Sequence, residues 1–172
     1  MTSRGRGGHT PTIEPQHRTE WFGVCTSQGF KFFGGRVHAT VMLDQMLDEW
    51  VLAPGSYPDL KVFPALGDGY AYLLDIGDKG YVGAETEALV WERGRPQLLP
   101  LRRANQYEQW PEGIQQILGQ LRHRIETAFS VLTTAFNLRV PHGRSFDGFV
   151  ARTATKMLAY TISFFLAQPV IA

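Results

Sequence analysis

The sequence has little cysteine and no long apolar run, and both absences narrow the classes of protein that it can encode. Its 172 residues include one cysteine, Cys25, which excludes an internal disulfide framework and a zinc site built from thiolates. The most apolar stretch, residues 157–172, is uncharged but has only 16 residues and contains Pro169. It is shorter than the roughly 20 residues that cross a bilayer. Residues 1–8 lack the apolar core of a secretory signal, so we expect a cytoplasmic protein with no membrane contact.

The charge is distributed unevenly along the chain. The formal net charge is only +1, yet residues 1–36 carry five basic and two acidic side chains, residues 37–92 two basic and ten acidic, and residues 93–172 ten basic and four acidic. A basic C-terminal part is the electrostatic pattern expected of a protein that binds a polyanion such as nucleic acid. Solvated arginines on helix surfaces would give the same balance, so charge alone leaves both interpretations open.

Hydrophobic patterning predicts an α/β fold, a mixed sheet covered by helices, in a single domain. Residues 1–28 are expected to form a disordered or irregular arm, followed by a domain over residues 29–168. The predicted strands cover residues 30–33 and 37–41 (one long strand with a bulge, or two short ones), 49–53, 70–76 and 97–101. The predicted helices cover a short segment at 57–60, residues 83–92, a long helix opened by Pro111 and a last helix that begins near Ser145.

Both long helices have an apolar stripe. The first repeats its apolar residues at three- and four-residue steps, through Ile114, Leu118, Leu121, Ile125, Ala128, Leu132 and Ala135. The last is expected to use Ser145 as its N-cap and to bury Phe149, Thr153, Met157, Tyr160 and Phe164.

Two acidic residues lie where α/β proteins often carry functional groups. Asp78 follows directly on the predicted strand at residues 70–76, and sites form at strand ends in α/β sheets. Glu126 lies one position off the apolar stripe of the first long helix, at the margin of the buried face, four residues after Arg122. Spacing alone favours structural roles, with Asp78 capping the next helix and Glu126 in an ordinary i,i+4 pair with Arg122.

Five short segments, taken together, resemble a known family. They are FFGGRVH at residues 32–38, LAPGSYPD at 52–59, GDKGYVG at 77–83, RHRIETAFS at 122–130 and KMLAY at 156–160. The third carries an aspartate at a strand end with an aromatic three residues later, and the fourth a glutamate followed by Phe-Ser and preceded by arginines. In this order they resemble the DDE transposases of bacterial insertion sequences, from about residue 29 to residue 165.

The resemblance implies a ribonuclease H-like fold, a central mixed sheet flanked by helices. It implies metal-dependent phosphodiester cleavage and strand transfer at insertion-sequence ends, with carboxylates holding two Mg²⁺ or Mn²⁺ ions. By motif position, Asp78 and Glu126 would be catalytic metal ligands, and Lys79, Arg122 and Arg124 would lie near DNA phosphates. The implied partner is double-stranded DNA, both transposon ends and target, bound by a homodimer in the nucleoid.

One part of the family's pattern is missing. The family's first catalytic aspartate belongs on a strand upstream of residues 32–38, but residues 1–43 contain no aspartate. We therefore expect an N-terminally truncated transposase domain, with its first strand and first metal ligand absent and its catalysis impaired. The alternatives are a non-catalytic DNA-binding or interaction remnant of the same domain and an unrelated small α/β protein.

Overall fold

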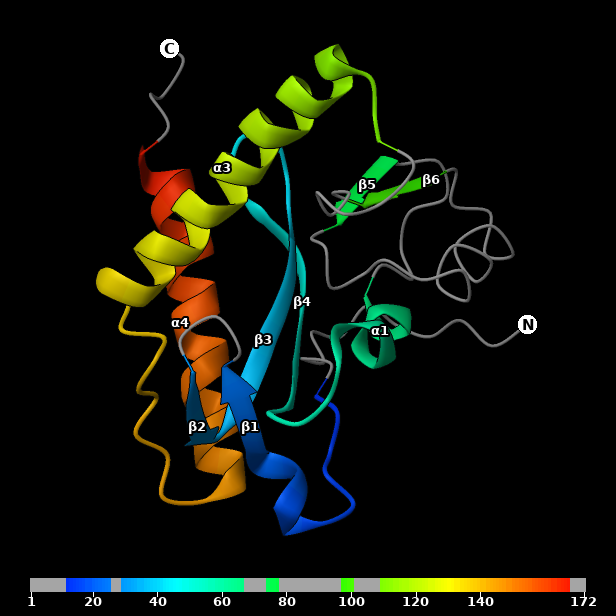
Figure 1. Cartoon of the computed structure of the whole chain (residues 1–172). Coiled ribbons are helices and arrows are strands. Elements are labelled where there is room, and N and C mark those ends of the chain that lie inside the picture. The colour runs from blue at the N-terminus through cyan, green and yellow to red at the C-terminus, as the bar shows by residue number, and fades with distance from the viewer. Residues whose placement is uncertain (1–11, 26–28, 67–73, 78–96, 101–108, 168–172) are drawn as a thin grey trace, which may run out of the picture.

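The computed structural model describes residues 12–25, 29–66, 74–77, 97–100 and 109–167, and over these ranges the chain is a mixed α/β protein, as predicted (Figure 1). Its strands form three two-stranded sheets, of which β1–β2 and β3–β4 are antiparallel and β5–β6 is parallel. The elements are a 3₁₀ turn at Arg18–Trp21, β1 Phe22–Cys25, β2 Phe30–Phe33, β3 Gly35–Val41, β4 Leu47–Pro54, α1 Asp59–Val62, a 3₁₀ turn at Phe63–Ala65, β5 Leu74–Gly77, β6 Gln97–Pro100, α3 Glu112–Thr134 and α4 Phe146–Ala167.

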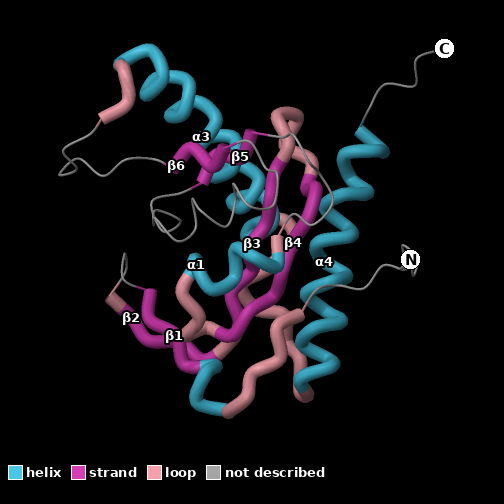
Figure 2. Tube along the Cα trace, turned by 90° about the vertical axis from the view of Figure 1, so that its right-hand side faces the viewer, coloured by secondary structure: helices cyan, strands magenta, loops and turns pink. Residues whose placement is uncertain are grey.

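The β3–β4 pair forms the centre of the described structure. Figure 2 shows α4 along one side of this pair and α1 on the other. Successive side chains of a strand point to opposite faces, and here both faces are apolar. Val37 and Ala39 contact the cluster formed with α3 and α4, whereas Val51 and Ala53 lie in a second cluster with Val62 of α1. The predicted strand at residues 49–53 and the short helix near residue 59 are therefore confirmed.

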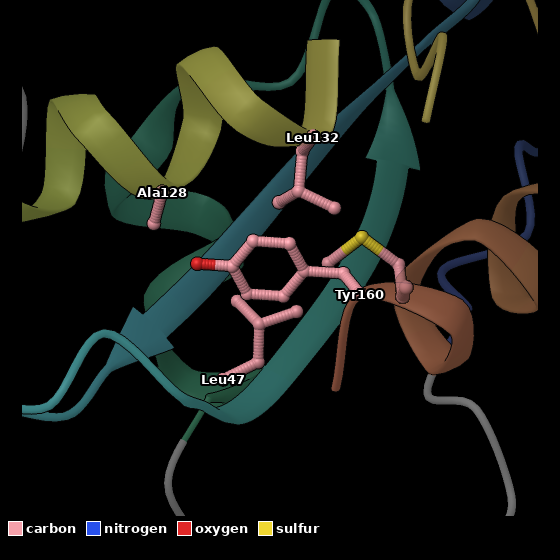
Figure 3. Close-up of a cluster of buried hydrophobic side chains, with 5 residues drawn as sticks. Leu47, Ala128, Leu132 and Tyr160 are labelled. Carbon is pink, nitrogen blue, oxygen red and sulfur yellow. The ribbon is translucent and has the colours of Figure 1, made fainter. Parts of the chain in front are cut away.

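The larger apolar core lies between β4, α3 and α4. In Figure 3, the ring of Tyr160 lies between Leu47 of β4 and the α3 residues Ala128 and Leu132. Met157 belongs to the same cluster, and none of the five is more than 7% exposed. Burying each of the larger side chains contributes about 1.5–3 kcal/mol to the free energy of unfolding. This burial holds both long helices against the strands.

Helix α3 is the long helix predicted to follow Pro111. Three members of its predicted stripe are buried, namely Leu118, Ala128 and Leu132. Leu121 and Ile125 are half-buried, whereas Ile114 and Ala135, at the two ends of the stripe, are exposed. In Figure 1 the first turns of α3 extend past the end of β3 and β4. Periodicity identifies the face of a helix that meets the core, but not how far along the helix the core reaches.

Helix α4 is the predicted last helix. Ser145 caps it as predicted, since its Oγ accepts a hydrogen bond from the Gly148 amide at 3.1 Å. Of the five residues expected to be buried, Thr153, Met157 and Tyr160 are buried. Phe149 and Phe164 are half-buried.

The structure places a strand inside the segment that was expected to be an irregular arm. Strand β1 pairs with β2, with Phe22 opposite Phe33. The two alternatives for residues 30–41 are thereby resolved, since β2 and β3 are separate strands in different sheets, with Gly34 between them. Trp21, just before β1, packs against Phe149 of α4 with ring centroids 5.7 Å apart. A strand of four residues has too few positions to show a period.

Strands β5 and β6 run parallel, with Leu74 opposite Gln97. They confirm residues 74–76 and 97–100 of the two predicted strands, while residues 70–73 and the predicted helix at 83–92 lie outside the described ranges. In the described part of the chain, these strands do not join the antiparallel pairs in one sheet. None of the described helices combines the length and apolarity needed to span a membrane.

Candidate functional site

The residues predicted to form a site fall partly outside the described structure. Strand β5 ends at Gly77, so Asp78 and Lys79 follow its carboxyl end directly in the sequence, but both lie outside the described residues. Glu126, Arg122 and Arg124 all lie on α3 and are described. Of the predicted site, the structure therefore describes only the residues on α3.

Glu126 lies on the exposed surface of α3. Arg122 Nε donates a hydrogen bond to Glu126 Oε1 at 2.7 Å, and the two side chains are 41% and 56% exposed, respectively. The predicted position at the margin of the buried face is wrong, because Glu126 is exposed. The ion pair is the i,i+4 contact that spacing alone favoured.

Arg124 has a different partner from the predicted DNA phosphate. Its Nη1 donates to the carbonyl oxygen of Leu43, in the turn between β3 and β4. This contact joins residues 81 positions apart in the sequence. Arg124 thus links α3 to the β3–β4 turn, although it remains exposed to solvent.

A metal site needs several ligands at one place, and the described residues do not supply it alone. Carboxylate oxygens are suitable ligands for Mg²⁺, and the exposed carboxylate of Glu126 has the right chemistry. Over the described ranges, however, no group of three or more His, Cys, Asp or Glu side chains could hold an ion. Any site at Glu126 therefore requires ligands from outside those ranges, of which Asp78 is the one the sequence predicts.

A second polar cluster joins the first two segments of the family resemblance. His38 Nδ1 and Arg36 Nη1, both on β3, each lie 3.9 Å from Asp59 Oδ1 at the start of α1. The His38 side chain is only 5% exposed, and the side chains of Arg36 and Asp59 are each 33% exposed. The cluster is a carboxylate flanked by a cation and a buried imidazole, next to a strand that is covered on both faces.

The environment of His38 disfavours its protonated form. Burial lowers the pKa of His38 below its ordinary value of 6.5, the Asp59 carboxylate acts in the opposite direction and the Arg36 guanidinium adds to the lowering. A neutral imidazole can both donate and accept a hydrogen bond. At neutral pH the cluster therefore consists of two opposite charges, on Arg36 and Asp59, beside the uncharged ring of His38.

The sequence pattern did not single out Arg36, His38 or Asp59 as site residues. The available signal was that all three lie in two of the five short segments used for the resemblance, residues 32–38 and 52–59. Their convergence depends on the path of the chain from β3 through β4 to α1, which spacing does not encode.

Comparison of the whole chain with models of known protein families, with curated proteins and with solved structures gives no match.

Proposed function

We propose that this chain is the catalytic-domain portion of a DDE transposase, which cleaves and joins DNA phosphodiester bonds at insertion-sequence ends. The observation that carries the proposal is the parallel pairing of β5 and β6. Carboxyl ends of parallel strands lie at the same edge of a sheet, where α/β proteins place their sites. Asp78 directly follows the carboxyl end of β5 in the sequence.

The order of the elements supports the same proposal. Two antiparallel pairs, a short helix at Asp59, a parallel pair and two long helices follow one another along the described chain. Four of the five resembling segments fall on described elements in the same order, with Glu126 on α3, and the third, residues 77–83, begins at the last residue of β5 and continues outside the described ranges. A ribonuclease H-like fold, in which a mixed sheet is flanked by helices, is the fold we propose for the complete domain.

In this proposal Asp78 and Glu126 hold divalent metal ions, Mg²⁺ or Mn²⁺. When bound, such ions neutralise the charge that builds up on a phosphate under attack and activate the attacking oxygen. The protein's own part is to bring carboxylates together from separate elements. Lys79, Arg122 and Arg124 contribute positive charge that attracts the DNA backbone.

Arg122 has a defined role in the state without metal. Its guanidinium donates to Glu126 Oε1 at 2.7 Å, so a metal ion held by this carboxylate would either compete with Arg122 for Oε1 or use Oε2. The two side chains are 41% and 56% exposed, and exposed ion pairs contribute about 0–1 kcal/mol. Losing the pair would therefore cost little.

The same ion pair favours a second candidate function, a non-catalytic DNA-binding remnant of such a domain. In this alternative Glu126 serves only as the partner of Arg122, and the basic residues bind DNA without metal.

Metal-dependent stabilisation separates the two candidates. We expect 10 mM MgCl₂ or MnCl₂ to raise the thermal unfolding midpoint of the full chain, because a ligand that binds only the folded state stabilises it. The rise should disappear in D78N and in E126Q. The matched control is E112Q, which removes a carboxylate from the first turn of the same helix and should leave the rise intact.

A rise that persists in both D78N and E126Q, or no rise with either ion, would overturn the catalytic proposal. In that case, binding of duplex DNA that weakens steeply with salt would support the remnant function.

A further inference from the structure

The β1–β2 hairpin has two chemically different faces. Side chains alternate along each strand, so Phe22 and Val24 of β1 share one face with Lys31 and Phe33 of β2, following the pairing of Phe22 with Phe33 and Val24 with Lys31. We call these four residues the outer hairpin face. All four are exposed, and Phe22 and Phe33 retain 59% and 55% of their accessible surface.

The opposite face attaches the hairpin to the rest of the protein. Gly23 is buried, and a Cβ at this position would collide with the Phe32 ring and lie 2.5 Å from the carbonyl oxygen of Gly55. Arg36 of β3 donates through Nη2 to the carbonyl oxygen of Val24 at 2.6 Å. The hairpin is therefore anchored through one face, and the exposure of its other face is part of the fold.

The outer hairpin face combines aromatic rings with positive charge. The guanidinium carbon of Arg18 lies 5.9 Å from the centroid of the Phe33 ring, and Lys31 lies in the same row of side chains. Neither strand contains an acidic residue. The nearby Glu20 is directed to the body of the protein, where its Oε2 accepts hydrogen bonds from the Gln16 amide and the Tyr57 hydroxyl.

We propose that the outer hairpin face binds a single-stranded segment of nucleic acid. Unpaired bases would stack on Phe22 and Phe33, and Arg18 and Lys31 would contact the phosphates. Exposed aromatic side chains beside cations are the means by which proteins bind single strands without reading their sequence. A duplex hides the faces of its bases in the stack, so it could use the cations but not the rings.

A second copy of the chain fits this face less well. Pairing two outer hairpin faces would bring Arg18 and Lys31 of one copy close to the same cations of the other, and like charges at an interface oppose association. The anionic backbone of a nucleic acid has the opposite sign. The positive charge of Arg18 and Lys31 thus favours a polyanion as the partner of this exposed aromatic surface.

The outer hairpin face is remote from β5, the strand that precedes Asp78 in the sequence. Figures 1 and 2 both place the hairpin at the opposite end of the β3–β4 pair from β5 and β6. The inference rests on the proposed function for the class of ligand, but it uses neither Asp78 nor Glu126. It adds a separate contact for a strand that is unpaired during cleavage or joining.

The test is fluorescence anisotropy of the full chain with a labelled 20-nucleotide oligo-dT in EDTA. F22L/F33L keeps apolar side chains on the hairpin but removes both rings, and should weaken binding by about 10-fold or more, given the stacking contribution of each aromatic. The matched control is F30L, which removes a ring of similar exposure, 48%, from the opposite face and should change affinity less than about twofold.

A second variant, R18A/K31A, replaces two exposed side chains and tests the proposal independently of the rings. For single strands, each phosphate contact contributes about 0.7 to the slope of log affinity against log salt. Losing two contacts should therefore make the slope for R18A/K31A shallower by about 1.4. Undetectable oligo-dT binding, or equal affinity for F22L/F33L and the parent, would overturn the inference. A parent that dimerises through this face, with dimerisation lost in F22L/F33L and oligo-dT binding unchanged, would also overturn it, in favour of self-association.

The two proposals fail separately. Loss of the metal-dependent midpoint shift with oligo-dT binding intact overturns only the proposed function, whereas the reverse result overturns only the hairpin inference.

Discussion

The hydroxyl of Tyr160 donates a hydrogen bond to the carbonyl oxygen of Gln45 at 2.9 Å, across 115 residues of sequence. Gln45 lies in the β3–β4 turn with a φ of 72°, a left-handed conformation that few non-glycine residues adopt. The same turn accepts the guanidinium of Arg124 on the carbonyl of Leu43. The last helix and α3 therefore both hold this turn through its backbone oxygens.

Tyr160→Phe should lower the free energy of unfolding by about 0.5–1.5 kcal/mol, since only the hydrogen bond is lost. Tyr160→Ala should cost about 3–5 kcal/mol, because it also empties the core between β4 and α3. Urea denaturation of both variants measures the difference. If Phe and Ala cost the same, the ring does not pack as Figure 3 shows.

The stability of the protein should fall on mild acidification through His38. Burial lowers the pKa of His38 below 6.5 in the folded state. Between the folded and unfolded pKa values the unfolded chain binds more protons, so the free energy of unfolding decreases as pH falls below 6.5. H38Q, which cannot titrate, should show a smaller loss between pH 7 and pH 5.5.

The matched control for this measurement is H123Q, which replaces an exposed histidine on α3 and shows the effect of a His-to-Gln change away from the cluster. A steeper loss in H38Q than in the parent would contradict the lowered pKa of His38.

The Arg122–Glu126 pair should contribute little to stability. Both side chains are largely exposed, so we expect a double-mutant cycle with R122A and E126A to give a coupling of about 0.3–0.5 kcal/mol that shrinks with salt. A coupling well above 1 kcal/mol would show that Glu126 is held too tightly to be released to a metal ion, and would count against its proposed role.

Two glycine-to-alanine changes should have opposite effects. At Gly23 a Cβ meets the Phe32 ring and the Gly55 carbonyl, so G23A should destabilise the protein by about 1–3 kcal/mol. At Gly119, in the middle of α3, nothing lies within 4 Å of an added Cβ, so G119A should stabilise it by up to about 1 kcal/mol. Thermal unfolding of the two variants measures both effects. A G23A variant as stable as the parent would show that the hairpin does not pack on Gly55.

Much of the fold could be predicted from local patterns. The stripe after Pro111 predicts α3, and Ser145 marks the start of α4 through the same hydroxyl that caps it. The strand β1 could not be predicted, because four residues with a glycine among them have no measurable period. Its pairing with β2 depends on a turn and on packing against Gly55, both outside the reach of a local pattern.

The candidate site was less predictable than the fold. Spacing places Arg122 and Glu126 on one side of α3, and the ion pair confirms that relation. The contact of Arg124 with Leu43 and the approach of His38 to Asp59 both depend on tertiary structure. Helical periodicity gives the angle of a side chain around its own axis but not which neighbour occupies that direction.

Arg36 contacts both the β1–β2 hairpin and the cluster at the start of α1. One guanidinium holds the hairpin backbone at Val24, lies over the Phe32 ring and faces the Asp59 carboxylate. A substitution at this one position would therefore remove an anchor of the β1–β2 backbone and a neighbour of the Asp59 carboxylate in the same step.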